Sequence, residues 1–369
     1  FAETAPVERV ITKERLSFLT ETEGTTVDYT NPALSDPTCA SYAVLRAPFD
    51  QWLAEQAEGE GAMFVNEIRV DDLIVEDGRV RGVRAGDDDM YARVTILADG
   101  AVSLLGQKLG MVPKLDPHKY AVAAKETIQL DEKTVSDRFG VVPGEGCAWL
   151  FVGDPTHGHI GGGFLYTNKD SVSLGVVTTI GDIDYSDISV PAMLKRLEAH
   201  PVVAPLIAGG DMREYTGRMV IEGGLAGVPE LVRDGVLIAG DAGALGLNTG
   251  YCVRGMDFAI ESGRLAAETV LAAKEKDDYS AASLATYTAR LDDSFIMKDL
   301  KHYAKFPAFM EETRRMFTDY GPMLNEIMGG LFTVDGSAPV PLTKKAMGAV
   351  KKVGLMNIAK DARKGMKAL

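Results

Sequence analysis

The chain of 369 residues is 46% hydrophobic and 25% charged, a composition that excludes a disordered protein and indicates a globular one with a sizeable core. Its formal net charge of −14 argues against nucleic-acid binding and suits an acidic enzyme or an electron-transfer protein that docks basic partners. The three cysteines, Cys39, Cys147 and Cys252, lie far apart, which excludes a self-contained iron–sulfur or zinc site of the usual spacing.

The first hundred residues are predicted to form short strands around one helix. Asn-Pro and Asp-Pro pairs separate the early strand-like runs, and Asp77-Gly78 predicts a hairpin turn between two later ones. The acidic run from Asp87 to Asp89 is interpreted as a solvated turn rather than a metal site. Strands are expected over 15–19, 26–29, 42–45, 63–70, 73–76, 79–84 and 91–97, with a helix over 50–58.

Residues 119–179 again have the pattern of strands, and they predict a mainly antiparallel sheet in a second domain. A helix over 191–200 and an apolar loop over 202–210 are expected to follow. The predicted strands of this sheet are 121–130, 147–152, 160–167 and 172–179.

The stretch from Asp234 to Gly243 predicts a nucleotide site. It reads as a buried strand over 236–239, a tight turn at Gly240-Asp241, a glycine-rich loop and a helix over 256–274. The Asp241 carboxylate can accept a hydrogen bond from a ribityl hydroxyl, and the helix N-terminus favours the negative charge of a reduced flavin. The alternative is an ordinary strand-to-helix turn, with Asp241 as a helix cap.

After Tyr287 the sequence turns helical, and apolar residues recur at helical spacing between Phe306 and Phe332. They predict either a core-facing helix or a monotopic surface that dips into a bilayer. The last 28 residues carry eight basic side chains and one acidic one, a net charge of +7. This basic tail, 342–367, is interpreted as a docking surface for anionic headgroups or an acidic protein, or else as a solvated end helix.

Several motifs point to one family when they are taken together. They are Tyr42-Ala-Val-Leu-Arg-Ala-Pro-Phe-Asp50, Ile96-Leu-Ala-Asp-Gly-Ala101, Gly161-Gly-Gly-Phe-Leu-Tyr-Thr-Asn168, Val203-Ala-Pro-Leu-Ile-Ala-Gly209, Glu222-Gly-Gly224 and the helix start from Gly255 to Arg264. In combination they resemble the FixC-type electron-transfer flavoprotein–quinone oxidoreductases, FAD enzymes of the glutathione-reductase-like superfamily with geranylgeranyl reductases as cousins.

The resemblance implies an α/β (α+β) fold: a glutathione-reductase-like FAD-binding domain discontinuous in sequence, an antiparallel-sheet substrate domain and a helical C-terminal region. The family's G-x-G-x-x-G is not found, so about 60 residues, a first βαβ unit and a connection, are expected to be missing before Phe1. The expected divisions are 1–41 (substrate-domain strands), 42–115 (FAD-binding part), 116–232 (substrate or quinone domain), 233–276 (return to the FAD-binding domain) and 277–369 (helical region with the basic tail).

The resemblance also supplies candidate FAD contacts. Arg46 would lie by the ribose or pyrophosphate, although a surface salt bridge is the alternative. Asp99 and Gly100 would lie against the dinucleotide, although Asp-Gly is also a common hairpin turn. Gly255 and Met256 would meet the isoalloxazine ring, with close helix packing as the alternative. The full predicted set is Arg46, Asp99, Gly100, Gly240, Asp241, Ala242, Asn248, Gly255 and Met256.

Other polar and aromatic residues are open to more than one interpretation. His157 and His159 invite a metal, but they lack a nearby third ligand and are expected in a surface loop. Cys252 falls in the flavin loop and is expected to be a packed thiol. Phe164 and Tyr166 are expected either to line a substrate pocket or to pack in the core.

The resemblance implies that electrons pass from an electron-transfer flavoprotein, through a separate ferredoxin-like FixX-type subunit, to FAD here and then to a membrane quinone. The cysteine count predicts no iron–sulfur cluster in this chain, and the expected location is cytoplasmic, peripheral on the inner face of the cell membrane. The sequence offers no catalytic acid–base pair, no metal site and no nucleic-acid partner; the cofactor would carry the chemistry. Two alternatives are an FAD-dependent geranylgeranyl (isoprenoid lipid) reductase and a flavin-free scaffold subunit.

Overall fold

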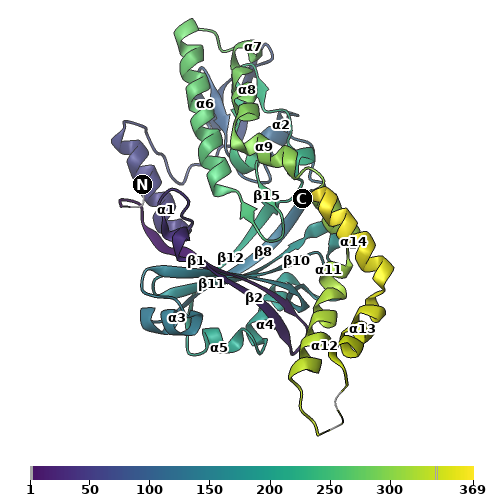
Figure 1. Ribbon diagram of the computed structural model, residues 1–369. Helices are drawn as coiled ribbons and strands as arrows, with labels where there is room; N and C mark the ends of the chain where they lie inside the picture. Colours follow the sequence, from purple (N-terminus) through teal and green to yellow (C-terminus); the bar gives the residue numbers. More distant parts are fainter. Residues whose placement is uncertain (1–2, 337, 339) are drawn as a thin grey trace.

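A computed structural model describes residues 3–336, 338 and 340–369, and its centre is a large mixed sheet (Figure 1). Helices α3 (Glu132–Phe139), α4 (Val190–Ala199) and α5 (Ala204–Ile207) lie on one side of this sheet. On the other side lies a second unit with its own buried core, which includes Leu97, Ile238 and Phe258. This arrangement confirms the predicted mixed α/β fold.

The strand order of the large sheet is β12-β8-β11-β10-β9-β1-β2, with β3 paired to β1. Neighbouring strands are antiparallel except β1 and β9, which pair in parallel. The strands are β1 (Val7–Leu19), β2 (Gly24–Thr30), β3 (Tyr42–Val44), β8 (Tyr120–Gln129), β9 (Glu145–Gly153), β10 (Gly161–Thr167), β11 (Ser171–Thr179) and β12 (Asp211–Ile221).

The two faces of the large sheet differ because side chains alternate along each strand. On the face toward α4, Trp149, Leu165 and Leu174 lie in register and pack with Met193 and Leu197 of that helix. Their neighbours along the strands, such as Tyr166, therefore point to the opposite face, toward the second unit. That face is available to line a site between the two units.

Arg9 of β1 is buried and ties the large sheet to the elements around it. Its guanidinium donates to the carbonyl oxygens of Asn168 (2.6 Å), Lys169 (2.8 Å), Glu145 (3.0 Å) and Glu132 (3.3 Å), and to Ser136 Oγ (3.1 Å). Burial lowers the pKa of Arg9. These hydrogen bonds satisfy a charge that is only 1% exposed.

The second unit contains a small sheet, of order β13-β14-β7, in which β7 and β14 run parallel. The 21-residue helix α6 (Met256–Lys276) packs beside it. The remaining strands are β4 (Asp72–Glu76), β5 (Arg79–Ala85), β6 (Asp88–Tyr91), β7 (Thr95–Leu97), β13 (Val232–Arg233), β14 (Val236–Ile238), β15 (Leu247–Asn248) and β16 (Val253–Arg254).

Helices dominate after residue 280; α11 and α12 pack against β9, β1 and β2 of the large sheet, and α13 and α14 lie outside them (Figure 1). Asn325 of α12 donates to the carbonyl of Phe18 (3.1 Å) and accepts from Thr25 Oγ1 (2.5 Å). The remaining helices are α1 (Arg46–Gly59), α2 (Leu104–Lys108), α7 (Ala281–Leu284), α8 (Thr286–Asp293), α9 (Phe295–His302), α10 (Phe306–Glu312), α11 (Arg315–Thr318), α12 (Tyr320–Phe332), α13 (Leu342–Val353) and α14 (Leu355–Ala368).

Several predicted elements are wrong or displaced. No strand forms over 63–70, where the apolar side chains are exposed (Met63 is 88% exposed) and have no partner strand. Asp88 and Asp89 lie in β6 rather than in a turn, and Tyr91 ends that strand exposed, so 91–97 is not one buried strand. Helix α1 begins four residues earlier than expected, and strand β12 and helix α3 were not predicted.

Asp361 of α14 anchors the C-terminal helices. Arg315 donates two hydrogen bonds to its carboxylate, both 2.7 Å long, and the Tyr320 hydroxyl donates a third at 2.7 Å. The carboxylate is 4% exposed, and the bonds from Arg315 hold its pKa below the usual range.

The Asp361→Asn variant is expected to lower the free energy of unfolding by about 2 kcal/mol at neutral pH, because a charged hydrogen-bonded pair becomes a neutral contact. The unfolded-state pKa of Asp is about 3.9. Since the folded-state pKa lies lower, this stabilisation is present above pH ~4 and is lost as the pH falls through the folded-state value. Urea unfolding should therefore show the full difference at neutral pH and a smaller one in acid. A difference that does not change with pH, or an equal loss in Glu326→Gln at an exposed ion pair with Lys352, would contradict this role.

Candidate functional site

The candidate cofactor site lies where the parallel strands β7 and β14 end. Leu97 pairs with Ile238, and the Ala239 N–H donates to the Leu97 carbonyl (2.9 Å). Two residues beyond Leu97 comes Asp99, and three residues beyond Ile238 comes Asp241. Because the carboxyl ends of parallel strands meet at the same edge, both carboxylates follow that edge, where open α/β sheets bind ligands.

Asp241 is the less constrained of the two carboxylates at this edge. The residue is exposed, yet the protein around it raises the pKa of the carboxyl, an effect that the nearby charge of Arg46 opposes. Among the described residues, none donates a hydrogen bond to the Asp241 side chain, and it does not cap α6. Because no group in the described part of the chain hydrogen-bonds to this carboxylate, its oxygens are free to accept hydrogen bonds from the hydroxyls of a ligand.

Arg46, the first residue of α1, lies close enough to Asp241 for the two charges to interact. Its guanidinium forms a two-pronged pair with Asp50 (2.8 Å for each hydrogen bond), so the salt bridge considered from the sequence is present. The pair is more than half exposed. The charge of Arg46 also reaches Asp241, so a cation lies near the free carboxylate.

Glycines bring the start of α6 close to Asp241. Gly240 has φ +60°, and a Cβ there would lie 3.3 Å from the Ala259 Cβ. Its N–H donates to Ser262 Oγ (2.9 Å), which fixes the end of the strand to the helix. A Cβ on Gly255 would lie 4.0 Å from Asp241 Oδ1, so Gly255 and the following Met256 lie beside the carboxylate, while Ala242 is buried.

Asp99 and Gly100 reach the same edge but have a local role. The Asp99 carboxylate accepts from Ser103 Oγ and from the Leu105 N–H, both at 3.0 Å, and so holds the first turn of α2. Gly100 has φ +82°, a conformation that glycine adopts without strain. Both residues therefore shape the edge, and Asp99 has fewer oxygens free for a ligand than Asp241.

Asn248 is hydrogen-bonded to a carboxyl that the sequence did not single out. Its Nδ2 donates to Glu222 Oε1 (3.0 Å), and Thr179 Oγ1 donates to Glu222 Oε2 (2.8 Å). These residues line a small pocket, which α10 also walls. The only sequence signal for Glu222 was the Glu-Gly-Gly segment that contains it. The residues that hydrogen-bond to Glu222 come from strands distant in the sequence.

The face of the large sheet toward the second unit carries Glu14, Ala148 and Tyr166 in register across β1, β9 and β10. Tyr166 stacks on Phe164 with ring centroids 5.5 Å apart. Burial raises the pKa of Tyr166 to about 12, and charge on Glu14 and Cys252 also raises it. The flavin-loop residue Cys252 thus lies near this sheet face, between the two units.

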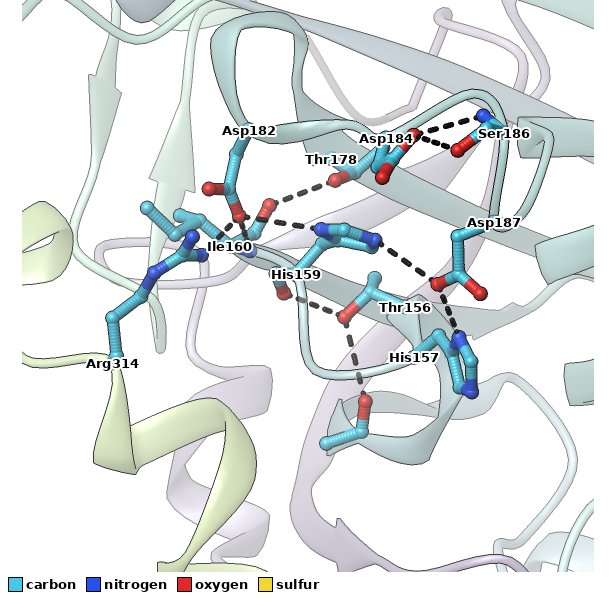
Figure 2. Close-up of polar contacts among 11 residues, drawn as sticks. Thr156, His157, His159, Ile160, Thr178, Asp182, Asp184, Ser186, Asp187 and Arg314 are labelled. Atoms are coloured by element: carbon cyan, nitrogen blue, oxygen red, sulfur yellow. Dashed lines mark hydrogen bonds and ion pairs between the residues drawn. The ribbon is translucent and has the colours of Figure 1, made fainter.

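His157 and His159 lie in the loop between β9 and β10, as expected, and they take part in a polar network there (Figure 2). His157 Nδ1 lies 2.7 Å from Asp187 Oδ2, and the ring nitrogens of His159 lie 3.6 Å from Asp182 and 3.7 Å from Asp187. Asp182 also pairs with Arg314, which links the sheet to the C-terminal helices. In the described residues, no group of three or more His, Cys, Asp or Glu is placed to hold a metal ion.

Comparison with known sequences identifies relatives along the whole chain. The sequence profile of the ETF-QO/FixC family C-terminal domain matches residues 306–369. A protein named probable electron transfer flavoprotein-quinone oxidoreductase YdiS, from Escherichia coli (strain K12), is 52% identical over 369 residues, which are 100% of this chain and 86% of that protein.

Solved structures show the same fold. A geranylgeranyl bacteriochlorophyll reductase-like protein from Thermoplasma acidophilum aligns with a TM-score of 0.65 and 20% identity, over 94% of this chain and 83% of that one. A variant of the halogenase PltM in complex with FAD aligns with a TM-score of 0.56 and 13% identity, over 97% of this chain and 70% of that one. At these identities the likeness concerns the fold, which is shared by flavin-dependent enzymes.

Proposed function

Because this chain belongs to the ETF-QO/FixC family of flavoprotein oxidoreductases, we propose that it passes electrons from an electron-transfer flavoprotein through FAD to a membrane quinone. The observation that carries the proposal is the free carboxylate of Asp241, near the charge of Arg46 and beside the start of α6. The proposed divisions 42–115 and 233–276 for FAD, and 1–41 and 116–232 for the substrate, belong to the same hypothesis.

In this proposal the chain's own residues bind and orient, while FAD supplies the redox chemistry. Asp241 accepts hydrogen bonds from ribityl hydroxyls, and Arg46 offers a cation to the phosphates or ribose. The first turn of α6 favours negative charge on the ligand. The proposed contacts are Arg46, Asp99, Gly100, Gly240, Asp241, Ala242, Asn248, Gly255 and Met256.

In this proposal, electrons from the electron-transfer flavoprotein reach this chain through a ferredoxin-like FixX-type subunit. Its support is the cysteine content: the sequence has three cysteines, of which Cys147 is buried and Cys39 is exposed. A four-cysteine cluster needs one more thiolate than this chain supplies. We therefore assign the iron–sulfur centre to the partner and not to this chain.

We also propose that the chain works at the inner face of the cell membrane through its C-terminal helices. Across the described residues, no helix is both long and apolar enough to cross a bilayer. Helices α13 and α14 carry the basic tail, and large apolar side chains are exposed between and beside its lysines: Phe332, Val334, Leu355, Met356 and Met366. Exposed apolar groups beside lysines suit the boundary of an anionic membrane.

The proposal predicts that quinone oxidises the reduced flavin. The protein would be reduced anaerobically and mixed with a short-chain quinone while the visible flavin absorbance is followed. Rapid return of the oxidised flavin spectrum is the expected result. A flavin that stays reduced with quinone but reacts with an isoprenoid double bond would replace the proposal with the lipid reductase. A protein that binds no flavin would favour the alternative of a flavin-free scaffold subunit.

A further inference from the structure

The Gly240-Asp241 turn has a fixed backbone and a free side chain. Within the turn, the Leu245 N–H donates to the Gly240 carbonyl (3.2 Å) and the Ala244 N–H donates to the Asp241 carbonyl (3.0 Å). Across to α6, the Gly240 N–H donates to Ser262 Oγ (2.9 Å). The Asp241 carboxylate, by contrast, accepts no hydrogen bond from the described residues. These contacts therefore determine where the carboxylate lies without occupying its oxygens.

The neighbours of Ser262 determine both roles of its hydroxyl. Its O–H donates to the Ala259 carbonyl (2.9 Å), which only accepts, so the oxygen is left to accept from the Gly240 N–H, which only donates. Ser262 is 0% exposed, and it lies on the face of α6 that carries the buried Phe258 and Leu265. Because the site is buried, water cannot replace the hydroxyl as the acceptor for Gly240.

Gly240 brings the segment after β14 directly onto α6. Its φ of +60° is a conformation that glycine adopts without strain, and a Cβ there would lie 3.3 Å from the Ala259 Cβ. No side chain of residue 240 separates the turn from the helix, so the hydrogen bond to Ser262 sets their spacing. The same helix begins beside the carboxylate, because a Cβ on Gly255 would lie 4.0 Å from Asp241 Oδ1. Ser262 thus connects the turn to the helix that borders the proposed flavin site.

We propose that Ser262 is a positioning residue for FAD: through the backbone of Gly240 it holds the Asp241 carboxylate where ribityl hydroxyls can donate to it. The inference rests on the proposed function, which supplies the FAD. Ser262 itself does not touch the ligand, since its hydroxyl is buried and both of its hydrogen bonds are internal. An acceptor that is already in place binds its ligand more tightly than one that must first be ordered. Loss of the Ser262 hydroxyl should therefore weaken FAD binding even though the Asp241 carboxylate remains.

The test is a double-mutant cycle that measures FAD affinity. Full-length apoproteins of wild type, Ser262→Ala, Asp241→Ala and the double variant are titrated with FAD. We expect Ser262→Ala to lower the affinity about 10-fold, which corresponds to the loss of one hydrogen bond of ordinary strength. The double variant should bind FAD no more weakly than Asp241→Ala alone, because Ser262 acts through that carboxylate. Two independent effects would instead multiply.

The matched control is Thr269→Ala, on the same helix. Thr269 is also 0% exposed, but its hydroxyl donates to the Leu265 carbonyl (2.9 Å) within α6. This variant should lower the urea midpoint of the apoprotein and leave its FAD affinity unchanged. A second variant of the positioning residue, Ser262→Cys, keeps a similar volume but offers only a weak sulfur acceptor. It should weaken FAD binding as Ser262→Ala does, and it replaces Ser262→Ala in the cycle if the alanine variant does not fold.

Wild-type FAD affinity in the Ser262 variants would overturn the proposal. So would affinity losses that multiply in the double variant, because Ser262 would then act independently of Asp241. An equal loss of affinity in Thr269→Ala would show that any weakening of α6 has this effect, and would also end the role assigned to Ser262. FAD affinity that Asp241→Ala leaves unchanged would instead overturn the proposed FAD site itself.

Discussion

The Asp241→Ala variant is expected to lose most of its flavin during purification, with FAD affinity lowered about 10- to 100-fold. The reason is that hydrogen bonds to a charged group contribute about 1.5–3 kcal/mol, and Asp241 has no bond to protein that would compensate. Alanine leaves the backbone turn intact, so the loss should concern the ligand and not the fold. The measurement is flavin content per chain, followed by titration of the apoprotein with FAD.

The matched control for Asp241→Ala is Asp87→Ala, which removes an exposed aspartate in the turn between β5 and β6. It should retain wild-type flavin content. Thermal unfolding of the apoproteins should be similar for both variants and wild type, because the Asp241 carboxylate makes no internal hydrogen bond among the described residues. Unchanged flavin occupancy in Asp241→Ala would remove the central support for the proposed FAD site.

The Arg9→Met variant is expected to have the largest effect on stability, about 3–5 kcal/mol. Methionine fills a similar volume but donates no hydrogen bonds, so the buried carbonyl oxygens of Asn168, Lys169 and Glu145 lose their partner. These oxygens belong to two separate segments, and the guanidinium connects them to a third through its bonds to Glu132 and Ser136. The loss should therefore appear as a lower denaturant midpoint for the large sheet, followed by tryptophan fluorescence, since Trp149 lies in that core.

Arg213→Met is the control for Arg9→Met, because Arg213 is an exposed arginine on β12 of the same sheet. Its midpoint should match wild type within the error of the measurement. Equal midpoints for Arg9→Met and wild type would show that the carbonyl oxygens find other donors, and would end the role assigned to Arg9.

Periodicity and turn chemistry predicted much of the large sheet. The expected strands over 121–130, 160–167 and 172–179 match β8, β10 and β11 within one residue at each end, since buried strands keep their apolar pattern and end at polar turns. The strand expected over 63–70 failed because apolar side chains alone do not form a strand. A strand also needs a neighbour with free backbone groups, and that neighbour is not visible in the local sequence.

The candidate site was predictable only where one segment builds it. Gly240, Asp241 and Gly255 belong to one strand–loop–helix unit, so their proximity follows from the sequence. Glu222 was found only in three dimensions, because Thr179 and Asn248 reach it from other strands, 43 and 26 positions away. The same holds for Tyr166 beside Glu14, since the pairing of β1 with β9 and of β9 with β10 brings them into one row.

The position of β1 also has a consequence for how the protein is made. β1 pairs in parallel with β9, and Asn325 of α12 then bonds to Thr25 and Phe18, residues 300 and 307 positions earlier. At about 5–20 residues per second, a ribosome needs roughly 15–60 s to add 300 residues. β1 can pair with β2 as soon as both are synthesised, but its other edge waits for β9, and its bonds to α12 wait for the last helices. The unpaired edge of β1 makes this part of the nascent chain a natural client for chaperones until its later partners emerge.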